Sequence, residues 1–175
     1  MVSTPKDPTF IPIDLDTHSR RISGYTAHKN LYFDVPLISH ITGNLYQGGV
    51  GPGLDLPEGI THLVSLYPWE HYNPSSSLRS SLTVLMYDSL NQGFSQVAPL
   101  AQWVNSCAKD GPTLVHCQAG LNRSALVVAR ALMFQGLSAP EAISLLRSTR
   151  DEAVLCNSSF EEWLLAQDQD PGGGR

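Results

Sequence analysis

The chain has 175 residues, of which 42% are hydrophobic and 15% are charged, and this is the composition of an ordinary globular protein with a single domain. Its formal net charge of −5 argues against a surface built mainly for nucleic acid or anionic lipid. No apolar run approaches the ~18 residues of a membrane-spanning helix, and the first ten residues hold prolines and an acid where a secretory signal needs an apolar core.

The first part of the chain predicts an arm followed by short strands. Residues 1–30 carry scattered Pro, Thr, Ser, Asp and Arg without periodicity, which indicates an N-terminal arm that is extended or partly mobile. The folded domain is expected over residues 31–168. Its first strands are predicted at 44–47, 62–67 and 82–87, and the second of these is largely apolar, as expected of a buried central strand.

The second part of the chain predicts helices and one further strand. Ser95 is expected to cap a helix that runs to about residue 109, and a strand follows at 113–117. Three more helices are predicted, at 123–135, at 138–149 and from residue 158 or 159 onward. Ser138 and Glu141 form a capping box at the start of the second of these. Residues 169–175 predict a disordered tail. This order of elements favours an α/β fold with a central, mostly parallel sheet flanked by helices.

The most informative stretch runs from His116 to Ser124. An apolar strand ends at Cys117, a five-residue loop follows, and a helix begins at Arg123. The backbone N–H groups of such a loop, together with those of the first helical turn, form an anion site suited to phosphate. Gly120 permits a backbone conformation that most residues resist. The same positive field favours the thiolate form of Cys117, which is the nucleophilic form.

Side chains at both ends of the loop supply further chemistry. The planar guanidinium of Arg123 can bind two phosphate oxygens at once and match the equatorial oxygens of the transition state. The hydroxyl of Ser124 can donate a hydrogen bond to the sulfur, which helps the sulfur to leave in a second step. Substrate is expected to contact the loop itself, namely Gln118, Ala119, Gly120, Leu121 and Asn122. The alternative, that Cys117 is merely a small buried hydrophobic residue, is disfavoured because His, Gly, Arg and Ser all stand at fixed spacings around it.

The pattern His-Cys-x-x-Gly-x-x-Arg-Ser resembles the signature of the protein tyrosine phosphatase superfamily. The chain is similar to the compact dual-specificity branch over residues 40–165. Residues 45–49 and 59–65 resemble early motifs of that branch, and Arg150, Asn157 and Phe160 resemble downstream ones, although Cys156 stands where the branch usually has Pro. The resemblance implies that residues 31–168 are a dual-specificity phosphatase-like catalytic domain. It also implies a cysteine-dependent mechanism that needs no cofactor.

The same resemblance implies a general acid. In the dual-specificity branch an aspartate lies on a loop upstream of the cysteine, and Asp88 is the only acidic residue between Glu70 and Asp110. Asp88 follows the predicted strand at 82–87, so it is expected at the sheet edge where Cys117 also emerges. A carboxylic acid at that place can protonate the leaving oxygen. The alternative is an Asp that caps an exposed loop.

The implied activity is hydrolysis of phosphotyrosine and phosphoserine or phosphothreonine on proteins, through a cysteinyl-phosphate. Relatives with lysines in the loop act on phosphoinositides, and this loop has none. Relatives with Asn before the Arg act on RNA 5′-phosphates, and Asn122 leaves that alternative open. A phosphoprotein-binding module without turnover would need a lost nucleophile or acid, whereas both are present. The expected partner is a phosphoprotein substrate, and neither nucleic acid nor a membrane is expected.

Other reactive residues have plainer expected roles. His116 is expected to orient the loop by hydrogen bonds, and Cys107 and Cys156 are expected in the core. Arg150 is expected first as a charge near a helix end and second as support for the site. The remaining histidines lack ligand spacing, so no metal is expected. The three cysteines do not form a disulfide framework, which favours a cytoplasmic location.

Overall fold

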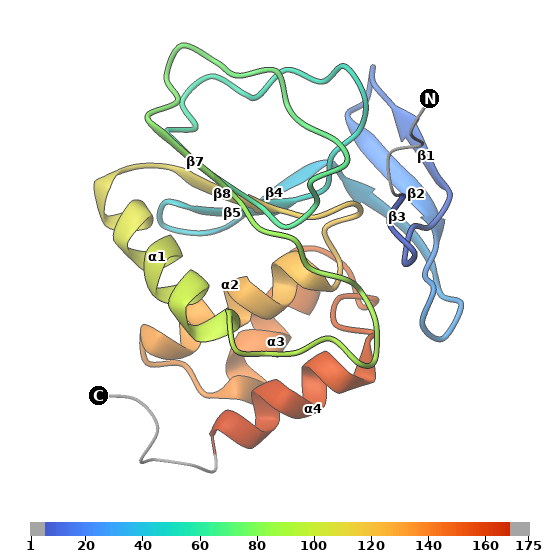
Figure 1. The fold of residues 1–175 in the computed structure, drawn as a ribbon, viewed down its shortest axis with the longest axis vertical. Coiled ribbons are helices and arrows are strands. Elements are labelled where there is room, and N and C mark those ends of the chain that lie inside the picture. Colours follow the sequence, from blue (N-terminus) through green and yellow to red (C-terminus); the bar gives the residue numbers. More distant parts are fainter. Residues whose placement is uncertain (1–5, 169–175) are drawn as a thin grey trace.

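The computed structural model describes residues 6–168, which form an α/β domain around a five-stranded sheet (Figure 1). The strands lie in the order β4 (Ile38–Thr42), β5 (Leu45–Gly48), β8 (Thr113–His116), β6 (His62–Ser65) and β7 (Ser80–Thr83). Neighbouring strands are parallel except β4 and β5, which are antiparallel. The predicted α/β fold with a central, mostly parallel sheet is confirmed. The predicted tail at 169–175 lies outside the described residues.

The middle strands of this sheet are buried along their whole length. Every residue of β6 and of β8 is buried, as expected of strands with neighbours on both sides and cover on both faces. The edge strand β7 alternates between more and less exposed residues instead. It ends at Thr83, earlier than the predicted strand at 82–87, because its one neighbour pairs with it only as far as Ser65. The chain then leaves the sheet and leads toward Asp88.

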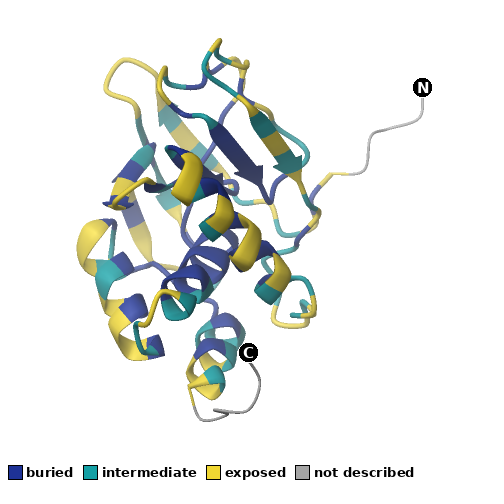
Figure 2. Cartoon of the chain, turned by 90° about the vertical axis from the view of Figure 1, so that its left-hand side faces the viewer, coloured by how far each residue is buried: buried dark blue, intermediate teal, exposed yellow. Residues whose placement is uncertain are grey.

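Four helices lie on one side of the sheet (Figure 1), namely α1 (Val97–Asp110), α2 (Arg123–Phe134), α3 (Ala139–Thr149) and α4 (Ser158–Gln167). Helix α2 is the central one, since it packs against the other three helices and against β5 and β8. Nine of its 12 residues are buried (Figure 2). This burial explains its apolar sequence and fixes the position of its first turn. Within residues 6–168, no helix combines the length and apolarity needed to cross a bilayer.

The N-termini of three helices can be compared with the caps predicted from the sequence. Helix α3 begins with the predicted capping box: Glu141 N donates to Ser138 Oγ at 3.3 Å, and Ser138 N donates to Glu141 Oε2 at 2.7 Å. The predicted cap at Ser95 is wrong, because α1 begins at Val97 and no side chain caps it. Helix α4 is capped by Asn157, whose side-chain oxygen accepts from two backbone N–H groups of the first turn.

Part of the predicted N-terminal arm belongs to a second, antiparallel sheet. Its strands are β1 (Ile13–Asp16), β2 (Arg21–Tyr25) and β3 (Tyr32–Pro36). The side chains of Ile22, Phe33 and Val35 are buried in the hydrophobic core. Residues 13–25 therefore form two paired strands joined by a turn rather than an irregular arm. Residues 6–12 precede β1 and lie outside the strands.

Candidate active site

Cys117 follows directly on β8, at the carboxyl end of the central sheet. Its backbone N–H donates to the carbonyl of Gly48 at 3.2 Å, which extends the pairing of β5 and β8 by one bond. The residue is only 2% exposed. Its Sγ lies 3.4 Å from Oγ of Ser124 in the first turn of α2. This distance suits a hydroxyl that stabilises the sulfur as a leaving group.

Close backbone contact shapes the loop at Gly120. The φ angle there is +72°, and a Cβ would lie 2.5 Å from the carbonyl carbon of Gly48. Any side chain would therefore meet the backbone of β5 as well as strain the loop. From the same strand, Gln47 Nε2 donates to the Gly120 carbonyl at 3.0 Å and to Ser124 Oγ at 3.2 Å. The motif at 45–49 thus supports the loop from behind.

Arg150, which follows α3, is a second support. Its Nε donates to the Gly120 carbonyl at 2.7 Å, and its Nη2 donates to the Ala119 carbonyl at 3.0 Å. Its Nη1 donates to the carbonyl of Pro36 and to Oγ of Ser39. Burial lowers the pKa of Arg150 to about 10, so the guanidinium stays charged at neutral pH. The main role of Arg150 is therefore to support the loop. The role that the sequence suggested first, as a charge near a helix end, is secondary.

The carbonyls of the loop all point toward the surrounding protein. Besides the two that Arg150 binds, the carbonyls of Gln118, Leu121 and Asn122 accept from backbone N–H groups outside the loop. Within the described chain we find no hydrogen bond donated by the backbone N–H groups of residues 118–122. The unused donors are thus those on the inner side of the loop. This is the arrangement that binds an anion.

Arg123 opens α2 with its guanidinium almost fully buried. Its Nη1 donates to Asp7 Oδ2 at 2.9 Å and to the carbonyl of Met86 at 3.2 Å. The guanidinium carbon lies 5.1 Å from the ring centre of Tyr67, a cation–π contact. Its Nε is buried without a hydrogen-bond partner among residues 6–168. Sequence reasoning missed Asp7, which stands 116 residues away from Arg123 in the chain.

His116 is buried and orients the backbone of Cys117, as expected. Its Nδ1 lies 3.1 Å from the carbonyl of Cys117, so Nδ1 carries the proton. Burial lowers the pKa of His116 to about 4, which keeps the ring neutral at physiological pH. The ring of Tyr72 meets it edge-on, and the Tyr72 hydroxyl donates to the carbonyl of Gly49 at 2.6 Å.

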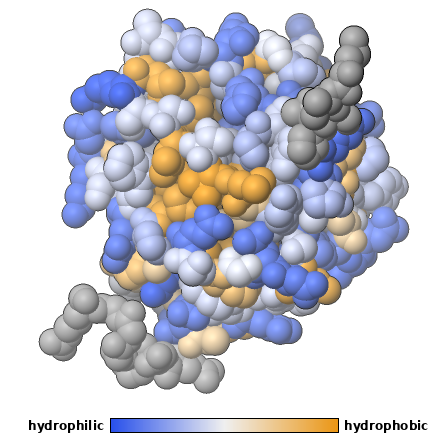
Figure 3. Space-filling view, in the orientation of Figure 1, coloured by the Kyte–Doolittle hydropathy of each residue, from blue (hydrophilic) through white to orange (hydrophobic). Residues whose placement is uncertain are grey.

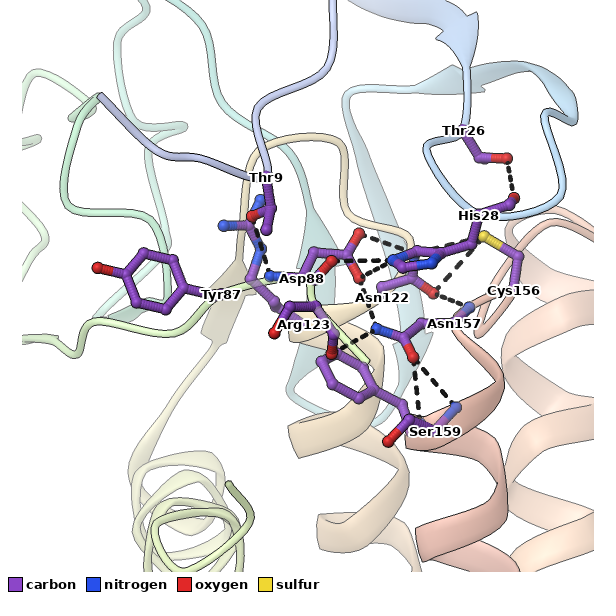
Figure 4. A network of polar contacts seen from close by, with 12 residues as sticks. Thr9, Thr26, His28, Tyr87, Asp88, Asn122, Arg123, Cys156, Asn157 and Ser159 are labelled. Carbon is purple, nitrogen blue, oxygen red and sulfur yellow. Dashed lines mark hydrogen bonds and ion pairs between the residues drawn. The ribbon is translucent and has the colours of Figure 1, made fainter. Parts of the chain in front are cut away.

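Asp88 lies at the centre of a polar network (Figure 4). Its Oδ2 accepts from Asn122 Nδ2 at 3.0 Å. Its Oδ1 accepts from Asn157 Nδ2 at 2.9 Å and from His28 Nε2 at 3.1 Å. The backbone N–H of Asp88 donates to Thr9 Oγ1 at 3.0 Å. His28 and Thr9 come from the N-terminal part of the chain, and no local sequence pattern linked them to Asp88.

This network controls the charge of Asp88. Burial alone raises the pKa of the carboxyl, but the hydrogen bonds from His28 and Asn157, together with the positive charges of Arg123 and His28, outweigh burial and lower the pKa overall. The pKa of His28 is raised, chiefly by its hydrogen bond to Asp88. In this arrangement the carboxyl is ionised at neutral pH. It must exchange partners before it can donate a proton.

The His28–Asp88 pair makes stability depend on pH. Because the pKa of His28 is raised on folding, the stabilisation is complete below about pH 6.5 and is lost as the pH rises through the folded-state pKa. The melting temperature of the wild type should therefore exceed that of His28→Gln by more at about pH 6 than at about pH 9. Thermal unfolding of both proteins across this range checks it. A constant difference would show that the pair carries no pH-linked stabilisation.

One narrow cavity brings the predicted residues together. Cys117, Arg123 and Asp88 line it with four of the predicted loop residues, Gln118, Ala119, Leu121 and Asn122. The amide of Gln118, however, binds the backbone of Ile11, and the amide of Asn122 binds Asp88 and the sulfur of Cys156. The opposite wall comes from the N-terminal part, namely Thr9, Ile11, Thr26 and Ala27. Cys107 and Cys156 are buried, as expected.

Residues 58–170 match the family model of the dual specificity phosphatase catalytic domain. This match covers more than half of the chain, so the chain belongs to the dual specificity phosphatase family, which is a family of protein phosphatases. MAP kinase phosphatase with leucine-rich repeats protein 3 of Dictyostelium discoideum is 29% identical over an alignment of 137 residues, which covers 73% of this chain. The chain spans only 15% of that relative's length.

Several solved structures share the fold. A mouse putative dual specificity phosphatase complexed with zinc tungstate is 23% identical with a TM-score of 0.64, over 77% of this chain and 89% of that one. Human DUSP28 is 19% identical with a TM-score of 0.62, over 77% and 96%. The human tyrosine phosphatase-like serine/threonine/tyrosine-interacting protein is 22% identical with a TM-score of 0.62, over 75% and 95%.

Proposed function

We propose that this domain hydrolyses phosphotyrosine, phosphoserine and phosphothreonine on proteins through a cysteinyl-phosphate at Cys117. The observation that carries the proposal is the loop after Cys117. Its carbonyls accept hydrogen bonds from outside the loop, whereas the N–H groups of residues 118–122 donate none to residues 6–168. Such a loop holds the oxygens of a phosphoryl group directly over the sulfur. Membership in the dual specificity phosphatase family supports the same chemistry.

In the first step the thiolate of Cys117 attacks phosphorus while Asp88 gives a proton to the leaving oxygen. The sulfur–phosphorus bond forms as the phosphorus–oxygen bond breaks. In the second step Asp88 takes a proton from a water molecule, which attacks phosphorus and releases phosphate. Ser124 Oγ, 3.4 Å from the sulfur, stabilises the thiolate as it leaves. The guanidinium of Arg123 and the loop N–H groups bind the charge on the equatorial oxygens in both steps.

The hydrogen bonds of Asp88 favour the second step but not the first. The ionised form that His28 and Asn157 favour is the base required in the second step. The first step needs the protonated form, so the carboxyl must lose part of this network when substrate binds. Asp88 is a site of proton transfer only if its loop can make that change.

Replacing Asp88 by Ala should lower kcat on a phosphotyrosine peptide by roughly 10² to 10⁴-fold. The Michaelis constant should change much less, because the phosphate still binds to the loop and to Arg123. Steady-state kinetics across the pH range checks this, and the alkaline limb of the kcat/KM profile, which arises when the general acid loses its proton, should flatten in the variant. Asp151→Ala is a matched control on another loop. Unchanged kcat in the Asp88 variant would place the acid elsewhere.

The substrate class follows from a comparison of rates. Leu85 and Leu90 are 47% and 56% exposed on the segments that lead to and from Asp88, and apolar side chains reach the surface in the middle of the face in Figure 3. These apolar side chains can pack against the surface of a protein substrate. We expect phosphotyrosine and phosphothreonine peptides to be turned over faster than a phosphoinositide or a 5′-triphosphate RNA. A faster rate on either of the latter would reassign the substrate.

A further inference from the structure

Residues 7–11 lie across the mouth of the candidate site and contact it at three points. Asp7 binds the guanidinium of Arg123 at 2.9 Å. Thr9 Oγ1 accepts from the backbone N–H of Asp88 at 3.0 Å. The backbone of Ile11 exchanges two hydrogen bonds with the side-chain amide of Gln118, at 2.8 and 3.1 Å. This segment, called here the N-terminal cover, therefore engages the guanidinium, the loop of the general acid and the anion loop together.

The carboxylate of Asp7 is held in place for this contact. Its side chain is 0% exposed and that of Arg123 is 3% exposed. Its Oδ2 meets Arg123, while its Oδ1 accepts from the backbone N–H and the hydroxyl of Thr9, at 2.8 and 2.6 Å. Both oxygens are thus bound and the pair is closed off from water. A buried ion pair of this kind resists the loss of one partner, because the other charge would stay buried and unpaired.

The contact with Asp7 weakens what the guanidinium of Arg123 can offer to a second anion. It donates through Nη1 to Asp7 and to a backbone carbonyl, and its Nε is buried without a partner among the described residues. A phosphoryl group needs two parallel N–H donors of the fork to bind in the bidentate manner. The carboxylate of Asp7 therefore occupies one donor of the fork and compensates the positive charge that would otherwise attract the phosphate of a substrate.

We propose that the N-terminal cover is a self-inhibitory segment, in which the carboxylate of Asp7 competes with the phosphate of the substrate for Arg123. The proposal rests on the function proposed above and adds regulation of the same site. Residues 7–12 precede β1 and make no strand pairing, so their release breaks no sheet. Release would also remove Thr9 from the backbone of Asp88, which frees the loop of the general acid to change partners.

The affinity for phosphate should then depend on the fraction of molecules in which the cover is released. An observed dissociation constant equals the intrinsic one divided by that fraction. Removing the charge of Asp7 raises the fraction, so the phosphate ligand should bind more tightly. Couplings of this kind are on the order of 5- to 100-fold.

The test uses the full chain in a Cys117→Ser background, so that the ligand is not turned over. Calorimetry should give a phosphotyrosine peptide a dissociation constant roughly 5- to 100-fold lower after Asp7→Asn is added. Asp14→Asn, which removes the same charge from an exposed position of β1, should leave it unchanged. Equal affinities in the Asp7 and Asp14 variants would overturn the proposal.

Two further measurements keep the test decisive. If Asp7→Asn fails to fold, Thr9→Val serves instead, since it loosens the cover but leaves the Asp7–Arg123 charges in place. It should tighten binding by a smaller factor, and unchanged affinity would again contradict the proposal. Turnover of p-nitrophenyl phosphate by the wild type is measured in parallel. If the wild type turns over the substrate but Asp7→Asn does not change the dissociation constant, only the self-inhibition is contradicted. If Asp7→Asn changes the dissociation constant but the wild type shows no turnover, only the proposed activity is contradicted.

Discussion

Replacing Cys117 by Ser should abolish turnover of p-nitrophenyl phosphate, with kcat lowered by roughly 10⁴-fold or more, the scale found when a nucleophile is removed. The sulfur stands at the base of the anion loop, 3.4 Å from Ser124 Oγ, and is the only thiol that lines the cavity among the described residues. A serine hydroxyl there is far less ionised at neutral pH and is a poorer nucleophile. Because Ser is close to Cys in size, the fold should be kept.

Cys107→Ser is the matched control for this variant. Cys107 is equally a buried thiol, but it lies in α1 and does not line the cavity. Its replacement should leave the steady-state constants near those of the wild type, while circular dichroism confirms that both variants fold. Retained activity in the Cys117 variant would defeat the mechanism.

Replacing Arg123 by Lys should lower kcat/KM by roughly 10³-fold, although the charge is kept. An ammonium is a point charge that cannot make two parallel bonds to a phosphoryl group, and it cannot keep the planar contact with the ring of Tyr67. Substrate affinity and stabilisation of the transition state should both decrease, because Arg123 binds phosphoryl oxygens in the substrate complex and in the transition state. Steady-state kinetics on a phosphotyrosine peptide measures the effect.

The control for Arg123→Lys is Arg147→Lys in α3. Arg147 also forms an ion pair, with Glu161 at 3.0 Å, and it also donates to backbone carbonyls, but it does not line the cavity. This change should leave kcat/KM almost unaltered. Near-normal kinetics in the Arg123 variant would show that the guanidinium has no special part in the reaction.

The features that sequence predicted well are those that depend on neighbours in the chain. The strand, loop and helix around Cys117 follow from an apolar run, a glycine and a second apolar run within one short stretch. The capping box at Ser138 depends on residues three apart, and it is present. The buried middle strands show no alternation, which is what their apolar sequences predict.

The features that sequence missed depend on contacts between distant parts of the chain. Asp7 meets Arg123 across 116 residues, and His28 meets Asp88 across 60. Nothing in the residues around either of them marks the partner. The strands of the N-terminal sheet were missed as well, because each holds only two or three apolar side chains among polar and charged residues.

Two other residues show how packing changes a role that sequence suggests. Arg150 reads as a charge near a helix end, yet burial turns it toward the carbonyls of the anion loop. Asn157 follows Cys156 where the family has Pro, but it still caps α4 and also donates to Asp88. In each case the side chain has several donors, and only the tertiary structure decides which acceptors they reach.

The most direct test is to look for the phosphoryl group on Cys117. With Asp88→Ala and p-nitrophenyl phosphate the first step needs little acid help, because nitrophenolate leaves without a proton, while the second step lacks its base. A phosphoenzyme should therefore accumulate. Acid quenching and peptide mapping by mass spectrometry should find phosphate on the peptide that contains Cys117, and none when Cys117 is also replaced by Ser. Phosphate released without any such phosphopeptide, or found on another residue, would contradict the account.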